Sequence, residues 1–133
     1  MTADLTGRGP EFLRFWSDRR LASLSTVRPD GTVHVVPVGV TLDAGAGVAR
    51  VITSGDSYKA RRALAAGAAG VPVAVCQVDG RHWSTLEGRA VVRSDAESVA
   101  DAERRYAERY RVPRPNPRRV VLEIAVSRVL GSW

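Results

Sequence analysis

Short stretches of alternating apolar and polar residues make up most of the chain, a period of two that is typical of strands with one buried face. Turn sequences such as RPDG at 28–31 and DG at 79–80 separate several of these stretches. Tight turns join antiparallel neighbours, so an antiparallel sheet is expected. The expected strands cover residues 21–27, 33–42, 48–53, 73–78, 82–93 and 119–130.

Three segments carry a helical pattern instead. Residues 10–19 begin with a proline, which suits the first turn of a helix, and place Phe12, Phe15 and Trp16 on one face. A second helix is expected over residues 57–67. A third follows Ser94, which together with Glu97 fits a capping box.

The second expected strand is interrupted by Pro37 and Gly39. Proline removes one hydrogen-bond donor from a strand, and glycine removes a side chain. Two interpretations stay open for this stretch. It is either an ordinary edge strand or a bare backbone surface that a flat ring could approach closely.

Together these elements predict a mainly-β fold with short helices. Short strands with open edges would aggregate, so closure into a six-stranded antiparallel barrel is the simplest arrangement. We expect a single domain over residues 1–133, with residues 1–9 as a flexible N-terminus. The N-terminal sequence lacks the apolar centre of a signal peptide, and no apolar run has the length of a membrane span. A cytoplasmic protein is therefore expected.

Charge narrows the range of partners. The net charge is +6 and the isoelectric point is about 10.6, which favours anionic ligands. Lys59 is the single lysine among 20 basic residues. Cys76 is the single cysteine, which excludes an intramolecular disulfide and a cysteine-paired metal site, and its apolar surroundings in the sequence favour a buried, inert thiol.

The stretch RVITSGDSYKARR, residues 50–62, combines a strand end, a turn and a helix start around Lys59. The first turn of a helix presents free amides and a partial positive charge, which suit a phosphate. The hydroxyls of Thr53, Ser54 and Ser57 could donate hydrogen bonds to it, and Arg50 adds charge. The alternative is a capped helix with a solvated lysine.

Other candidates carry weaker signals. Gln77 and Trp83 flank the turn at 79–80, where they could bond to and cover a ring, although core packing is the favoured explanation of Trp83. His34 and His82 lack an acidic neighbour at useful spacing, so neither is expected to act as a base or a metal ligand. The segment RYRVPRPNPRRVV, residues 109–121, could contact acidic groups or could be a solvated connection. No nucleophile elbow, phosphate loop or dinucleotide fingerprint is present, which argues against a hydrolase or a kinase.

Several blocks of the sequence, in one order over most of the chain, resemble a known family. They are LASLSTVRPDGTVHVVPVG, ARVITSGDSYKARR, VCQVDGRHWSTLEGRA, DAERRYAERYRVPRPNPRR and RVLGS. The resemblance is to the split β-barrel proteins of the pyridoxamine 5'-phosphate oxidase-like superfamily, which include FMN-binding members, and within it to the deazaflavin (coenzyme F420)-dependent reductases of actinobacteria.

The resemblance implies a homodimer with the cofactor in a groove between the subunits. It implies that the segment around Lys59 holds the cofactor phosphate, that the strand at 35–38 lies against the cofactor ring, and that either chain supplies Gln77 and Trp83. The expected cofactor-binding residues are Lys59, Ser57, Thr53, Ile52, Tyr58, Ser54, Arg50, Val36, Pro37, Val38, Gln77 and Trp83. Substrate contacts are expected at Arg118, Arg119 and Asn116.

The implied activity is hydride transfer from reduced F420 to a tetrapyrrole, biliverdin, giving bilirubin. Two alternatives stay open: an FMN-dependent split-barrel oxidoreductase, and a non-catalytic carrier of F420, haem or a bilin. Neither nucleic acid nor a membrane is expected as a partner. Aromatic residues make up 6% of the chain and lie in apolar patterns, whereas single-strand binding needs exposed aromatic residues between basic ones.

Overall fold

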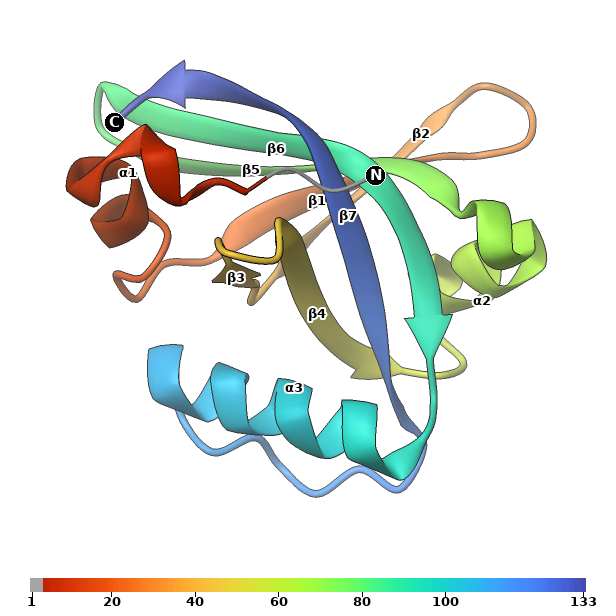
Figure 1. Cartoon of the computed structure of the whole chain (residues 1–133). Helices are drawn as coiled ribbons and strands as arrows, with labels where there is room; N and C mark the ends of the chain where they lie inside the picture. Colours follow the sequence, from red (N-terminus) through yellow and green to blue (C-terminus); the bar gives the residue numbers. More distant parts are fainter. Residues whose placement is uncertain (1–3) are drawn as a thin grey trace.

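The computed structural model describes residues 4–133, which form one antiparallel sheet with three helices around it (Figure 1). The strands are β1 Ala22–Val27, β2 Val33–Val38, β3 Thr41–Asp43, β4 Val48–Ser54, β5 Val71–Asp79, β6 His82–Arg93 and β7 Arg119–Ser132. The helices are α1 Pro10–Phe15, α2 Tyr58–Ala66 and α3 Ala96–Arg109, with short 3-10 turns at Thr6–Arg8 and Gly67–Ala69. The predicted mainly-β antiparallel class is confirmed.

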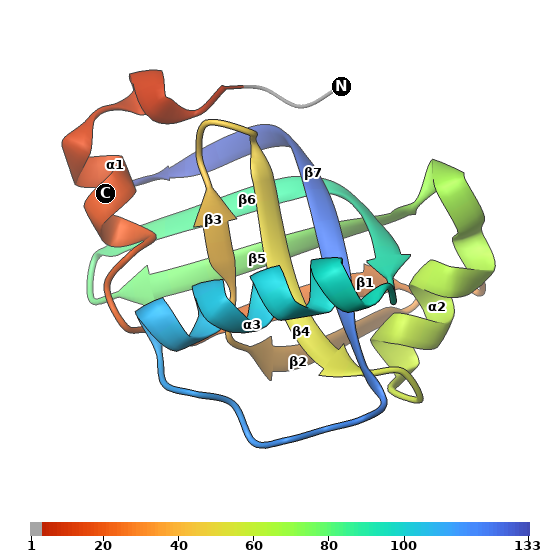
Figure 2. The same ribbon diagram turned by 60° about the horizontal axis from the view of Figure 1, so that its bottom comes forward.

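The order of strands across the sheet is β2-β1-β5-β6-β7-β4-β3. The two edge strands, β2 and β3, are consecutive in the chain and only Gly39 and Val40 separate them. Such a short link requires the sheet to curl until its two edges converge at this point, as Figures 1 and 2 show. The result is a barrel that is closed at Gly39 and Val40 and split beyond them.

The predicted strand over residues 33–42 is thus two strands, and the sheet has seven strands rather than six. Pro37 pairs with Ser23 near the end of β2, and the chain leaves the ladder at Gly39. Local sequence marked the interruption, but only the closed shape of the sheet places the two halves at opposite edges.

The third helix begins one residue later than the sequence indicated. Asp95 is its N-cap, because its carboxylate accepts a hydrogen bond from the amide of Ser98 at 3.0 Å. The predicted capping box of Ser94 and Glu97 is replaced by this single contact. A carboxylate at this position also benefits from the positive end of the helix dipole.

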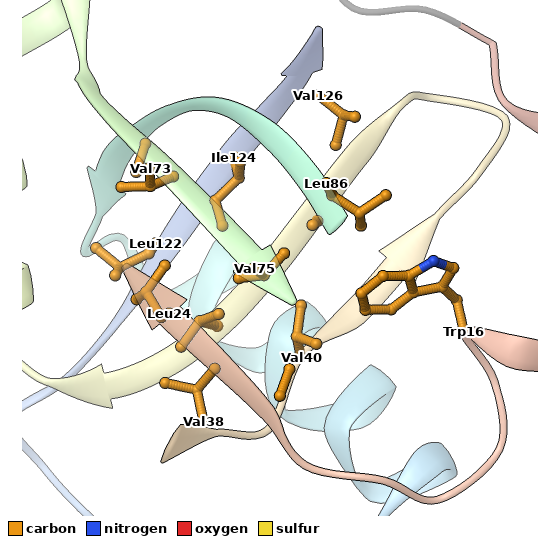
Figure 3. Packing of buried hydrophobic residues seen from close by; sticks show 14 of the residues in the cluster. Trp16, Leu24, Val38, Val40, Val73, Val75, Leu86, Leu122, Ile124 and Val126 are labelled. Carbon is orange, nitrogen blue, oxygen red and sulfur yellow. The ribbon is translucent and has the colours of Figure 1, made fainter. Parts of the chain in front are cut away.

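The core fills the inside of the curled sheet (Figure 3). Alternate residues of neighbouring strands, such as Leu24, Val75, Leu86 and Ile124, are fully buried there. Helix α1 closes one end, where the indole of Trp16 donates a hydrogen bond to the hydroxyl of Ser84 at 3.1 Å. The sheet and α1 therefore form one core rather than two units.

Part of the segment 1–9, for which the sequence predicted a flexible N-terminus, contacts the core. Residues 1–3 lie outside the described residues. Leu5 is buried in the core, and its amide donates to the carbonyl of Ala44 at 2.8 Å. Within residues 4–133, no helix is long and apolar enough to span a membrane.

Candidate functional site

The split in the barrel leaves one strand half-paired. β3 pairs with β4 only from Val48 to Arg50, whereas β7 pairs with β4 along its whole length. The β3-side edge of β4 is consequently free from Val51 to Ser54. A pocket of about 340 Å³ lies between this free edge and the end of β2. Its lining consists of Pro37, Val38, Gly39, Ile52, Thr53, Ser54, Lys59, Tyr106, Arg111, Pro113, Arg114, Asn116 and Arg119.

The start of α2 forms one wall of this pocket. Ser57 caps the helix, because its hydroxyl oxygen accepts from the amide of Ala60 at 3.3 Å. The same oxygen accepts from the hydroxyl of Thr53 at 3.1 Å. The hydroxyl proton of Ser57 is used by neither bond, so this group can still donate to a ligand.

Positive charge faces the pocket from two directions. Lys59 projects from α2, Arg111 and Arg114 come from the extended segment between α3 and β7, and Arg119 is the first residue of β7. Arg119 is paired with Glu103 at 2.6 Å and also donates to the carbonyl of Arg114 at 2.6 Å. No Asp or Glu belongs to the lining, so the pocket carries a net positive charge.

Lys59 is half-buried, and burial lowers the pKa of its ammonium group. No carboxylate among residues 4–133 lies within ion-pair distance of it; the nearest in sequence, Asp56, accepts from the hydroxyl of Ser54 at 2.6 Å and pairs with Arg118 at 3.4 Å. A partly desolvated charge without a counter-ion is unfavourable, and an anion in the pocket would remove this cost. The pocket therefore fits a phosphate group.

The bare backbone at Gly39 is occupied by rings of the protein itself. A Cβ at this position would lie 2.7 Å from Cε2 of Tyr106 and 3.2 Å from Cε2 of Tyr110. The hydroxyl of Tyr110 accepts from the amide of Val40 at 3.1 Å. Glycine is thus needed for α3 to approach the β2–β3 link, and the flat-ring surface that the sequence suggested is partly filled by tyrosines.

The structure brings together most of the predicted phosphate-binding residues. The pocket is lined by Ile52, Thr53, Ser54 and Lys59 from this set. It is also lined by Pro37 and Val38, which were predicted to lie against the cofactor ring, and by Asn116 and Arg119 from the predicted substrate-binding set. Ser57 lies directly behind this wall through its bond to Thr53. Sequence reasoning missed Tyr106, and it named Arg111 and Arg114 only as part of the segment 109–121, because their approach depends on how α3 and the proline-rich segment fold back across β4.

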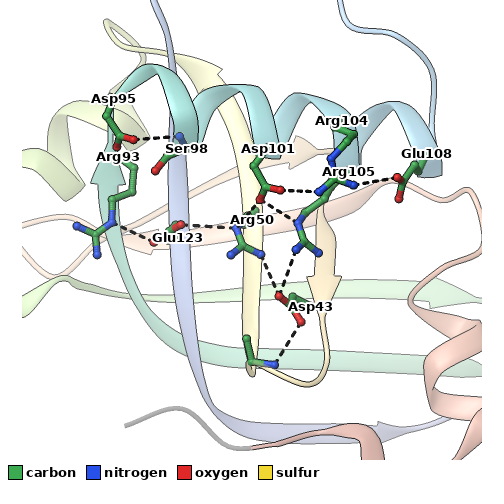
Figure 4. A network of polar contacts seen from close by, with 11 residues as sticks. Asp43, Arg50, Arg93, Asp95, Ser98, Asp101, Arg104, Arg105, Glu108 and Glu123 are labelled. Carbon is green, nitrogen blue, oxygen red and sulfur yellow. Dashed lines mark hydrogen bonds and ion pairs between the residues drawn. The ribbon is translucent and has the colours of Figure 1, made fainter.

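Arg50 does not lie in the pocket. Its guanidinium lies 3.6 Å from Asp43, 3.5 Å from Glu123 and 4.0 Å from Asp101, in a network beneath α3 (Figure 4). Its side chain is 15% exposed. The local sequence placed Arg50 on the same strand face as Ile52, but three carboxylates from distant elements hold its charge.

Gln77 and Trp83 also lie outside the pocket of this chain. Gln77 is fully buried; its amide donates to the carbonyl of Phe15 at 2.6 Å, and its carbonyl accepts from Arg109 at 2.6 Å. Trp83 pairs with Ser132 at one end of β7, whereas the pocket residues of β4 pair with the other end. Neither side chain belongs to the lining of the Lys59 pocket.

The remaining predicted residues surround the pocket without lining it. The ring of Tyr58 contacts that of His34, with the centroids 4.8 Å apart and the planes tilted by 46°, and thereby fixes α2 against the β1–β2 hairpin. Val36 packs against the core. Arg118 points to solvent beside Asp56, and its amide donates to the side chain of Asn116 at 2.9 Å. In residues 4–133, no group of three or more His, Cys, Asp or Glu side chains is placed to hold a metal ion.

Comparison with known proteins finds relatives that match nearly the whole chain. A relative described as an F420H(2)-dependent biliverdin reductase, from Mycobacterium tuberculosis (strain CDC 1551 / Oshkosh), is 52% identical over 132 residues, which cover 99% of this chain and 93% of the relative. A solved structure described as an F420 reductase has a TM-score of 0.69 at 22% identity and covers 88% of this chain and 94% of its own.

A second solved structure, a conserved hypothetical protein from Mycobacterium tuberculosis, has a TM-score of 0.75 at 23% identity and covers 97% of this chain and 86% of its own. At these identities the structures establish the split-barrel fold and nothing further. The sequence model of the family described as pyridoxamine 5'-phosphate oxidase matches residues 9–132. The chain therefore belongs to the pyridoxamine 5'-phosphate oxidase family.

Proposed function

We propose that this protein is an oxidoreductase that transfers a hydride from reduced coenzyme F420 to biliverdin and so produces bilirubin. The observation that carries the proposal is the 52% identity, over 99% of the chain, to a relative described as an F420H(2)-dependent biliverdin reductase. The cationic pocket around Lys59 supports it independently, because F420 carries a phosphate and acidic groups beyond it.

In this proposal Lys59 binds the cofactor phosphate as a point charge, and the free proton of the Ser57 hydroxyl adds a hydrogen bond. Arg111 and Arg114 supply further positive charge at the mouth of the pocket. Because no acidic side chain lines the pocket, the phosphate meets no like charge. These residues bind and orient the cofactor and take no part in bond making.

The deazaflavin ring, when bound, supplies the hydride, and the protein contributes position. Pro37 and Val38 at the end of β2 form an apolar edge of the pocket on which a ring can rest. A pocket of about 340 Å³ is at the lower end of the range for small-molecule sites, so a ligand as large as F420 extends beyond it. The proposal therefore places the rest of the cofactor along the groove outside the pocket.

We include a homodimer in the proposal. Val27, Val33 and Val35 are 42%, 54% and 56% exposed and share the outward face of the β1–β2 hairpin. Next to them lies a hollow of about 440 Å³ with a largely apolar lining that includes Pro72 and Ala74. A second copy that covers this face would bury the exposed valines. It would also allow a partner chain to bring residues such as Trp83 to the groove.

For the substrate, the arginine-rich segment before β7 is the proposed contact. Asn116 and Arg119 line the pocket, and Arg118 lies at its exposed margin, where the propionates of a bile pigment could reach it. The proposed location is the cytoplasm, where a free thiol such as Cys76 stays reduced.

The test is a side-by-side titration of the purified protein with F420 and FMN, followed by rapid mixing of the protein and reduced F420 with biliverdin. The proposal predicts tighter binding of F420 than of FMN and single-turnover formation of bilirubin. Tighter binding of FMN would instead indicate a flavin-dependent oxidoreductase of the same family. F420 binding without turnover of biliverdin or another acceptor would make it a carrier.

The dimer is tested separately by sedimentation of the wild type and of a Val35→Glu variant. The proposal predicts a mass of two chains for the wild type and dissociation of the variant, because a charge in an apolar interface is costly. A monomeric wild type that still binds F420 would remove the dimer from the proposal and leave the phosphate site in place.

A further inference from the structure

The amine of Lys59, the single lysine of the chain, differs chemically from that of a solvated lysine. The side chain is half-buried in its pocket, and burial lowers the pKa of the ammonium group. No carboxylate among residues 4–133 lies within ion-pair distance of it, and the nearest in sequence, Asp56, pairs with Arg118. Partial desolvation without a counter-ion increases the fraction of neutral amine, which is the nucleophilic form.

Groups that can bind a phosphate surround this amine. Arg114 lines the pocket, and no salt bridge within residues 4–133 involves it. The side-chain oxygen of Asn116 accepts from the amide of Arg118 at 2.9 Å, which leaves its NH2 group as the donor for a ligand. The hydroxyl proton of Ser57 is likewise used by neither of its bonds. A nucleophile and several phosphate-binding donors therefore share one volume of about 340 Å³.

An acyl phosphate is the class of small molecule that would use both features. Its phosphate is bonded directly to a carbonyl carbon, so a bound phosphate places an electrophilic carbon beside the amine. When the bond between that carbon and the bridging oxygen breaks, negative charge develops on the departing phosphate. Cations and hydrogen-bond donors that already surround the phosphate stabilise this charge. The pocket would thus both concentrate the reagent and assist its leaving group.

We propose that Lys59 is an acylation site, to which the pocket directs the acyl group of a small acyl phosphate such as acetyl phosphate. The neutral amine attacks the carbonyl carbon, and a nitrogen–carbon bond forms. The bond from that carbon to the bridging oxygen breaks, and inorganic phosphate leaves with its electron pair. The proton lost from the nitrogen passes to solvent. No oxidant or further reactant is needed, and the product is an uncharged amide at position 59.

Acylation removes the positive charge of Lys59 and so changes what the pocket can bind. The consequence for the cofactor rests on the proposed function, in which this charge binds the phosphate of F420. The acylated protein should then bind F420 about tenfold more weakly. Bound F420 should in turn protect Lys59 from acylation. The modification would act as a chemical switch on the cofactor site.

The test compares the wild type with the double variant Lys59→Arg and Arg61→Lys. This variant keeps the net charge and a single lysine, but it places that lysine at an exposed position of α2 outside the pocket. Both proteins are incubated with acetyl phosphate, and acetylation of the lysine is followed by peptide mass spectrometry over time. Thermal unfolding checks that both are folded.

At pH 7 the lysine of the wild type should be acetylated about tenfold faster than the lysine of the double variant. The wild-type rate should saturate with acetyl phosphate, and inorganic phosphate should slow it by competition. In the double variant the rate should rise linearly with acetyl phosphate and ignore inorganic phosphate. If the double variant does not fold, saturation and phosphate protection in the wild type decide the case.

Equal rates in the two folded proteins overturn the proposal, as does a wild-type rate that neither saturates nor responds to inorganic phosphate. Titration of the acetylated wild type with F420 is a separate measurement. If saturation and protection are observed but neither form binds F420, the acylation site stands and the proposed function fails. If acetylation leaves F420 affinity unchanged, the acylation site also stands, and the contact between Lys59 and the cofactor phosphate is contradicted.

Discussion

Two charged regions lie along the same face of β4, and they differ in how their cations are paired. At Arg50, three carboxylates surround one guanidinium, and each of them also contacts another arginine (Figure 4). Two and four residues further along the strand, Ile52 and Ser54 border the pocket of Lys59, whose lining has four cations and no acidic residue. Within four residues, the strand passes from a closed ion network to an open cationic cavity.

The difference teaches that a basic residue near a candidate site is informative only once its partners are known. Arg50 and Lys59 both belong to the stretch RVITSGDSYKARR, and sequence alone gave them the same role. Tertiary structure separates them, because α3 brings Asp101 to Arg50 and brings only Tyr106 to the pocket. Arg50 is accordingly expected to matter for stability and Lys59 for binding.

The largest effect is expected for Lys59→Met. Loss of the ammonium should weaken F420 binding about 10- to 100-fold, roughly 1.5–3 kcal/mol, because a charge-assisted contact to the phosphate is removed. Stability should be unchanged or slightly higher. Since burial lowers the pKa of Lys59, its charge opposes folding at neutral pH, and this opposition fades as pH rises through the folded and then the unfolded pKa.

Fluorescence titration measures the affinity for F420, and urea unfolding measures the stability of the Lys59→Met variant. The matched control is Arg61→Met, which removes a charge from an exposed position of the same helix outside the pocket. Equal loss of affinity in both variants would show that only the overall charge matters.

Arg50→Met should give the opposite result. The free energy of unfolding should fall by about 2 kcal/mol, because the network is partly buried and loses its central cation, although each carboxylate keeps at least one other arginine. Affinity for F420 should stay within about twofold of the wild type. If the variant lost most of its affinity for F420 at unchanged stability, Arg50 would be a cofactor-binding residue, contrary to this account.

Ser57→Ala should have an intermediate effect on both quantities. Removal of the helix cap should cost about 1 kcal/mol of stability. Loss of a hydroxyl donor should weaken F420 binding by about fivefold. Ser57→Thr keeps the hydroxyl and is the rescue control; failure of threonine to restore affinity while restoring stability would limit Ser57 to capping.

Arg118→Ala should have the smallest effect. Its pair with Asp56 is exposed on both sides, so solvent and salt already weaken it, and no change in unfolding midpoint is expected. Steady-state kinetics with biliverdin then isolate any role in substrate binding, because a rise in KM at unchanged stability would assign Arg118 to the substrate. An unchanged KM would remove it from the proposed contacts.

The features that could be predicted from the sequence are those that depend on residues close together in the chain. Strands such as β6 His82–Arg93 were predicted with their observed bounds, because alternation is a local signal. A phosphate site around Lys59 was predicted from equally local features, since strand end, cap and lysine are adjacent in the chain; the structure places a cationic pocket there.

Contacts between residues far apart in the chain could not be predicted from local sequence patterns. Gln77 was assigned to the cofactor, but its amide and carbonyl are engaged by Phe15 and Arg109, which are 62 and 32 residues away. Tyr106 was read only as part of a helical stripe, and its place in the pocket depends on how α3 crosses β4. The division of residues 33–42 into two edge strands likewise required the curl of the whole sheet.

Because Lys59 is the only lysine, a protein labelled at the lysine ε-carbon gives one side-chain NMR signal that reports on the pocket alone. The account predicts that F420 raises the pKa of Lys59 above its lowered value in the free protein, since the bound phosphate favours the charged form. By linkage, affinity should be constant below the free pKa and fall about tenfold per pH unit up to the pKa in the complex. A signal and a pKa that do not change when F420 saturates the protein would contradict the assignment of the phosphate to this pocket.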